Sequence, residues 1–119
     1  MKKKVIIILP TYNEEGNITS LIEEVFKVTS SLSTWQTEIL VVDSHSPDKT
    51  ATAVLSLKKK YPEKLHLLNT EKEGLGKAYY RGFKYALENF HPYLFFSMDA
   101  DWSHLPKYIP LFFKKIEAG

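Results

Sequence analysis

The sequence predicts an α/β fold in which a mostly parallel, four-stranded sheet carries helices on both faces. Four short runs rich in β-branched or aromatic residues alternate with four stretches of helical periodicity. The strand-like runs are apolar at consecutive positions, which is typical of strands buried on both faces. Strands that alternate with helices are joined by right-handed crossovers, so we expect the strands to lie parallel in one sheet. With 119 residues, 44% of them apolar, the chain has the size and core of one compact domain.

The first strand and helix occupy residues 4–26. Residues 4–9 (KVIIIL) predict the strand, and we expect Pro10 to end it. Asn17 is the expected N-cap of the helix that follows. Apolar residues then recur on one helical face at positions 18, 21, 22, 25 and 26.

The second pair begins with a strand over residues 38–42 (EILVV). Ser46 and Pro47 resemble an N-cap followed by proline at the first helical position, which predicts that the second helix starts there. The buried side of this helix is expected at positions 53, 54 and 57.

The second half of the chain repeats the alternation. Residues 65–68 predict the third strand, and residues 93–98 (YLFFSM) predict the fourth. The third helix follows Gly74, with its apolar face expected at positions 75, 78, 79, 83, 86, 87 and 90. A last helix is marked by positions 109, 112, 113 and 116, and two nearby prolines obscure its start.

Composition narrows the classes of function. The net charge of +2 gives no strong electrostatic footprint for nucleic acid. No cysteine is present, which excludes disulfides and thiolate metal sites. The longest apolar runs fall far short of the ~20 residues of a membrane helix, and no signal peptide is visible, so we expect a soluble stretch of chain.

Polar residues gather after three of the predicted strands. In parallel α/β sheets, ligands bind beyond the carboxyl ends of the strands. The segments at those ends read PTYNEEGN (residues 10–17), DSHSPDKT (residues 43–50) and DADWSH (residues 99–104). We therefore expect the functional site at this edge of the sheet.

Asp99 and Asp101 are the most telling of these residues. In a strand, residues i and i+2 point to the same side, so both carboxylates could face one point. Two like charges tolerate this only with a cation or donors between them. Mg²⁺ or Mn²⁺ is the natural occupant, with phosphates and water completing its shell. The alternative is a solvated turn.

The remaining candidates have equally ordinary alternatives. No dinucleotide-type glycine pattern follows the first strand. The turn at Gly74 opens a helix whose N-terminus could favour an anion, with Lys77 or Arg81 nearby. Tyr12 could stack on a base or be structural, and Asp43 could simply cap its turn.

Four segments taken in order resemble the family-2 glycosyltransferases: LPTYNEEGNI, EILVVDSHSPDKT, EGLGKAYYRGFKYA and MDADWSHLPKYIP. The nearest branch is the polyprenyl-phosphate (dolichyl-phosphate) mannosyltransferases and glucosyltransferases, and the similarity runs from about Val5 to the last residue. The resemblance implies a GT-A fold, which is a Rossmann-like nucleotide-binding sandwich. It also implies transfer of a sugar from a nucleotide-sugar to a lipid phosphate.

Site residues are implied position by position. The resemblance assigns nucleotide binding to Pro10, Tyr12, Glu14, Val42, Asp43, Ser44, Asp99 and Ala100. It assigns the divalent metal to Asp99, Asp101 and Ser103, with Asp101 also catalytic. Three positions depart from the family pattern: Ser44 replaces a second acid that usually holds the base, His45 replaces a glycine, and Trp102 replaces a leucine.

The implied reaction is metal-dependent transfer of mannose or glucose, from a GDP- or UDP-linked donor, with inversion at the anomeric carbon. The acceptor would be a polyprenyl phosphate at the cytoplasmic face of a membrane. Relatives continue for about as many residues again, so residues 1–119 are expected to be the donor-binding part, inactive or weakly active alone. The competing hypothesis is a non-catalytic nucleotide-binding or interaction module of the same fold.

Overall fold

The computed structural model describes residues 2–100 and 106–118. Within these ranges, four parallel strands form one sheet in the order β3-β2-β1-β4. The strands are β1 (Lys3–Thr11), β2 (Trp35–Asp43), β3 (Leu65–Asn69) and β4 (Leu94–Ser97). The helices are α1 (Ile18–Thr29), α2 (Thr50–Lys58), α3 (Leu75–Asn89) and α4 (Ile109–Glu117), the last preceded by a 3₁₀ turn, Pro106–Tyr108. The predicted fold class is confirmed.

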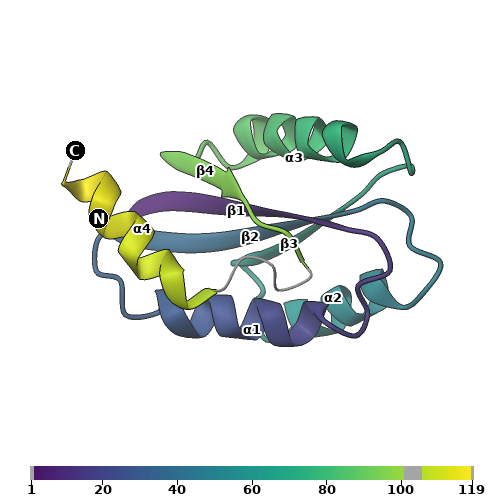
Figure 1. The fold of residues 1–119 in the computed structure, drawn as a ribbon, viewed down its shortest axis with the longest axis horizontal. Helices are drawn as coiled ribbons and strands as arrows, with labels where there is room; N and C mark the ends of the chain where they lie inside the picture. The colour runs from purple at the N-terminus through teal and green to yellow at the C-terminus, as the bar shows by residue number, and fades with distance from the viewer. Residues whose placement is uncertain (1, 101–105, 119) are drawn as a thin grey trace.

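Helices cover both faces of the sheet. Figure 1 shows α3 on one side, with α1 and α2 on the other. Strand residues alternate between two apolar clusters, as period-2 geometry requires. Val5, Ile7 and Leu9 of β1 belong to the larger cluster, which α1, α2 and α4 complete. Ile6 and Ile8 belong to the smaller cluster under α3.

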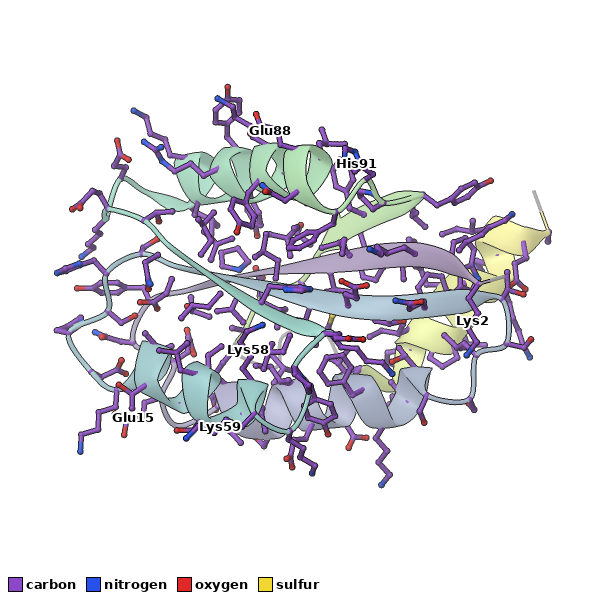
Figure 2. All side chains as sticks on the ribbon, turned by 180° about the vertical axis from the view of Figure 1, so that it is seen from behind. Lys2, Glu15, Lys58, Lys59, Glu88 and His91 are labelled. Atoms are coloured by element: carbon purple, nitrogen blue, oxygen red, sulfur yellow. The ribbon has the colours of Figure 1, made fainter. Side chains whose placement is uncertain are left out.

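The outer surfaces are charged. Figure 2 shows side chains filling the spaces between the sheet and its helices, while Glu88 on α3 and Lys59 after the end of α2 lie on the outer faces. Lys58 instead turns toward β3, where its ammonium donates to the Leu65 carbonyl at 2.6 Å. Lys2 and Glu15 lie at opposite ends of the molecule in the same view. No helix within residues 2–100 and 106–118 has both the length and the hydropathy to cross a bilayer.

Helix α3 approaches the sheet closely because its inner face is made of small residues. Ala78, Gly82 and Ala86, spaced four apart, are the buried residues of this helix. A Cβ added at Gly82 would lie 2.9 Å from methyl groups of both Ile8 and Val42. The predicted apolar face was therefore partly wrong, since two of its leucines, Leu75 and Leu87, are more than half exposed.

Strand β1 continues through Pro10, although proline was expected to end it. Pro10 pairs in register with Val42 of β2. The backbone groups of even-numbered β1 residues point toward β4, as the bond from the Met98 N–H to the Ile8 carbonyl shows. The β4 ladder ends at Ser97, opposite Ile8, so no ladder bond requires an N–H at residue 10.

Helix α2 begins at Thr50, not at the predicted Ser46–Pro47 start. The Ser46 hydroxyl is used elsewhere, donating to Asp43 at 2.6 Å. Asp48 instead receives the backbone N–H of Thr50 at 2.9 Å and also contacts its hydroxyl. Asn17 does occupy the N-cap position of α1, but its side chain makes no capping hydrogen bond.

Candidate functional site

A cavity of about 400 Å³ opens at the carboxyl edge of the sheet. Its walls come from the ends of β1, β2 and β4, the segment after β3, and the first turn of α3. The lining residues are Pro10, Thr11, Tyr12, Glu14, Ser44, Lys72, Gly74, Leu75, Ala78, Asp99 and Ala100. This is the edge at which parallel α/β sheets bind ligands.

Six of the predicted site residues line this cavity: Pro10, Tyr12, Glu14, Ser44, Asp99 and Ala100. Val42 does not line it, because its side chain is buried in the core under α3. Asp43 does not line it either, and lies 2% exposed behind the wall. Asp101 and Ser103 lie outside the described residues, as does Trp102.

Asp43 fixes the loops that form the cavity wall. Its carboxylate accepts the Thr11 hydroxyl at 2.7 Å and the Ser46 hydroxyl at 2.6 Å, together with the Ser46 backbone N–H at 3.0 Å. The Ser46 oxygen in turn accepts the backbone N–H of Asn13 at 2.9 Å. Asp43 therefore caps its turn and joins the ends of two strands, and its expected role in nucleotide binding stays a prediction.

The turn after β2 keeps a glycine-like conformation despite its histidine. His45 has φ 54°, in the left-handed region that favours glycine. The preceding residue, Ser44, is 8% exposed, and its backbone N–H donates to the Thr11 carbonyl at 3.0 Å. The cavity wall at position 44 thus presents a hydroxyl-bearing side chain in place of a carboxylate.

The loop after β1 is held against the start of α2. The Glu14 N–H donates to the Thr50 hydroxyl at 3.0 Å, and the Glu15 N–H donates to Asp48 at 3.2 Å. A reciprocal bond runs from the Lys49 N–H to the Glu15 carboxylate at 3.1 Å. These bonds hold the segment that carries the cavity residues Tyr12 and Glu14.

Among the described residues that line the cavity, Lys72 carries a positive charge, and the sequence interpretation missed it. Its Nζ lies 4.1 Å from the centroid of the Tyr12 ring, within cation–π range. The two cations proposed from sequence, Lys77 and Arg81, instead pair with Glu73 at 3.4 and 2.6 Å. Lys72 follows the end of β3, so applying the strand-end rule to all four strands would have found it.

Asp99 receives a hydrogen bond from α3. The Tyr79 hydroxyl donates to Asp99 Oδ1 at 3.1 Å. Burial, and then the neighbouring negative charge of Asp99, raise the pKa of Tyr79 above its ordinary value of 10. The phenol is consequently protonated at neutral pH and acts as the donor.

The donor set at the cavity fits a hard divalent cation. Asp99 supplies carboxylate oxygens, and Mg²⁺ or Mn²⁺ commonly needs only one or two carboxylates when substrate phosphates supply further ligands. Within residues 2–100 and 106–118, no cluster of three or more His, Cys, Asp or Glu side chains forms a complete protein cage.

Two curated relatives resemble nearly the whole chain. The dolichol-phosphate mannosyltransferase of Pyrococcus furiosus is 40% identical over 98% of this chain. The polyprenol monophosphomannose synthase of Mycolicibacterium smegmatis is 35% identical over 98% of it. The chain spans 31% and 42% of the lengths of these two proteins.

A solved structure supports the same grouping. It is the mannosyltransferase PcManGT from Pyrobaculum calidifontis in complex with GDP-Man and Mn²⁺. The match has a TM-score of 0.67 and 27% identity, and it covers 85% of this chain and 28% of the other. The family model for glycosyl transferase family 2 matches residues 6–119. On this evidence the chain belongs to glycosyl transferase family 2 and has the GT-A fold of that family's solved members.

Proposed function

We propose that this chain forms the donor-binding part of an inverting glycosyltransferase that transfers a hexose from a nucleotide-sugar to a polyprenyl phosphate. One observation carries the proposal. Six residues expected from sequence to bind the donor, drawn from three segments far apart in the chain, line a single cavity of about 400 Å³. A volume of this size is within the range of small-molecule sites.

The cavity offers separate surfaces for the parts of a nucleotide-sugar. Tyr12 provides an aromatic face on which a base can stack, and Ser44 provides a hydroxyl for one hydrogen bond. Lys72 supplies positive charge for the diphosphate. GDP-mannose is the donor best supported, because PcManGT is described with GDP-Man and both curated relatives are named for mannose transfer.

Asp99 would hold Mg²⁺ or Mn²⁺ against the diphosphate, together with Asp101 and Ser103. When bound, the ion supplies Lewis-acid stabilisation of the leaving diphosphate as its negative charge grows. PcManGT is described with Mn²⁺, which supports this choice. Lys72, which also lines the cavity, would add a second positive charge.

The acceptor we propose is a polyprenyl phosphate, on the strength of the names of the two curated relatives. Its attacking oxygen carries negative charge near neutral pH, because the second pKa of a phosphate monoester is about 6. A strong protein base is therefore less necessary than for a sugar hydroxyl. A lipid acceptor would place the reaction at a membrane surface, and we propose the cytoplasmic face.

Calorimetric titration of the protein with GDP and with UDP, each with Mn²⁺ and with EDTA, tests the donor site. We expect nucleotide binding that strengthens at least tenfold with Mn²⁺ and is tighter for GDP than for UDP. Tighter binding of UDP than of GDP would indicate a UDP-linked sugar as the donor and would leave the proposed glycosyl transfer unchanged. Binding indifferent to the metal, or no binding, would contradict the proposal and favour the non-catalytic module.

A further inference from the structure

Tyr79 contacts the proposed metal-binding carboxylate without lining the cavity. It lies on the first half of α3, one residue after the cavity residue Ala78, and its hydroxyl donates to Asp99 Oδ1 at 3.1 Å. The two residues are 20 positions apart in sequence, on a helix and just beyond a strand. This contact joins the helix above the sheet to the carboxyl end of β4.

The Tyr79 ring is itself held in place. It stacks on Phe83, one helical turn later, with ring centroids 6.2 Å apart and planes 15° apart. Phe83 packs against Phe95 of β4 at 4.9 Å. Because β4 also leads into Asp99, the donor hydroxyl and the acceptor carboxylate are both fixed relative to the same strand.

The contact is chemically compatible with metal binding. An ionised carboxylate has about four lone-pair sites, so it can accept a hydrogen bond and coordinate a cation at once. Ligating carboxylates are commonly oriented by such outer hydrogen bonds, and removing one typically costs 10- to 100-fold in metal affinity or activity.

We propose that Tyr79 is a positioning residue, whose hydroxyl orients the Asp99 carboxylate for the divalent cation of the donor site. This inference rests on the proposed function and adds a residue that the strand-end motifs do not contain. The simpler alternative is that Tyr79 only packs in the row formed with Phe83 and Phe95. The two hypotheses differ only in whether the hydroxyl oxygen of Tyr79 contributes to metal binding.

The variant Tyr79→Phe separates them, because it removes the hydroxyl and keeps the ring. Tyr80→Phe is the matched control: Tyr80 is the next residue of α3 and is 65% exposed. Each protein is titrated with Mn²⁺ alone, following free Mn²⁺ by electron paramagnetic resonance. Each is then titrated with GDP in the presence of Mn²⁺ and of EDTA, and thermal unfolding is recorded by circular dichroism.

We expect Tyr79→Phe to weaken Mn²⁺-dependent GDP binding about tenfold, while GDP binding in EDTA stays as in the wild type. Tyr80→Phe should match the wild type in every titration. The proposal is overturned if Tyr79→Phe retains wild-type Mn²⁺ dependence, or if it loses affinity equally with and without the metal.

A different set of results would show that the proposed donor site itself is wrong. If the wild-type protein binds GDP without any response to Mn²⁺, and binds no Mn²⁺ alone, both the proposed function and the role of Tyr79 are overturned. If the wild type shows the metal response and Tyr79→Phe shares it in full, only the role of Tyr79 fails.

Discussion

Strand β2 carries two buried carboxylates, one in its amino-terminal half and one at its carboxyl end, and the groups that surround them differ. Glu38, 3% exposed, lies toward the amino edge of the sheet, and Asp43, 2% exposed, lies at the carboxyl edge. Glu38 is surrounded by basic groups: His66 Nε2 at 2.8 Å and the Lys4 ammonium at 3.5 Å. Asp43 is held by the neutral hydroxyl and N–H donors of Thr11 and Ser46.

The difference shows that a buried acid does not by itself mark a functional site. Around Glu38, the carboxylate contacts side chains of its own strand and of the two strands beside it: Gln36 of β2 donates at 3.0 Å, and Lys4 of β1 and His66 of β3 lie at 3.5 and 2.8 Å. Around Asp43, the hydrogen bonds hold the loops that follow β1 and β2, and the cavity opens beside these loops. The carboxylate next to the candidate site is therefore the one whose hydrogen bonds hold two loops beside a cavity.

Replacing Asp43 should have the largest effect, because it combines loss of stability with loss of the site. Asp43→Ala removes the acceptor for three donors, two of them hydroxyls fixed within the protein. We expect the free energy of unfolding to fall by about 3 kcal/mol, since hydrogen bonds to charged groups contribute about 1.5–3 kcal/mol each and are not additive. Urea denaturation measures this, and GDP titration of the folded variant should show no metal-dependent binding.

The matching change at the other edge is Glu38→Gln. It removes the negative charge that pairs with Lys4 and that is hydrogen-bonded to His66, so we expect the free energy of unfolding to fall by about 2 kcal/mol. GDP affinity should stay within twofold of the wild type, because the cavity lies at the other end of β2. A large loss of GDP affinity in Glu38→Gln would mean that Glu38 also affects the cavity, which would contradict the distinction between the two carboxylates.

Lys72→Ala should give a smaller effect, confined to binding. Its ammonium lines the cavity and is exposed, so one charge acting on a diphosphate at about 4 Å in water is worth about 1 kcal/mol, or about fivefold in affinity. Lys77→Ala is the control, since Lys77 pairs with Glu73 outside the cavity. Equal losses in both variants, measured by GDP titration, would indicate a general charge effect and not a contact in the cavity.

The smallest effect concerns acid pH. Burial raises the pKa of Glu38, but the hydrogen bond from His66 and the charge of Lys4 outweigh it and hold the pKa below the ordinary 4.5. The carboxylate therefore contributes stability that is fully present above pH 4.5 and is lost as the pH falls through the lowered pKa. Between pH 6 and pH 3, urea denaturation should show the wild type losing more stability than Glu38→Gln, and parallel curves would refute the assignment.

Much of this architecture could be predicted from the pattern of apolar residues. The four strands and four helices follow from periodicity, and the strand-end rule located the edge that carries Tyr12, Ser44 and Asp99. The errors lie where tertiary contacts override local preference. Pro10 continues a strand because β4 has already ended beside it, and Ser46 serves Asp43 instead of capping a helix.

The two residues that the sequence interpretation missed differ in how they could have been found. Lys72 follows the end of β3, so the strand-end rule could have pointed to it, but its contact with the Tyr12 ring and the pairing of Lys77 with Glu73 are visible only in the structure. Tyr79 was expected only as part of the apolar face of the third helix. Its hydrogen bond to Asp99 depends on how closely the small inner face of α3 approaches the sheet.

The central claim is that a divalent cation and a nucleotide diphosphate bind together at the carboxyl edge. Paramagnetic broadening of backbone amide resonances by Mn²⁺ in the presence of GDP tests it most directly. We expect strong broadening for cavity residues such as Thr11 and Ala78, and sharp signals near Glu38 and Thr37, farther toward the amino end of β2. Broadening centred on Glu38, or spread evenly over the protein, would contradict it.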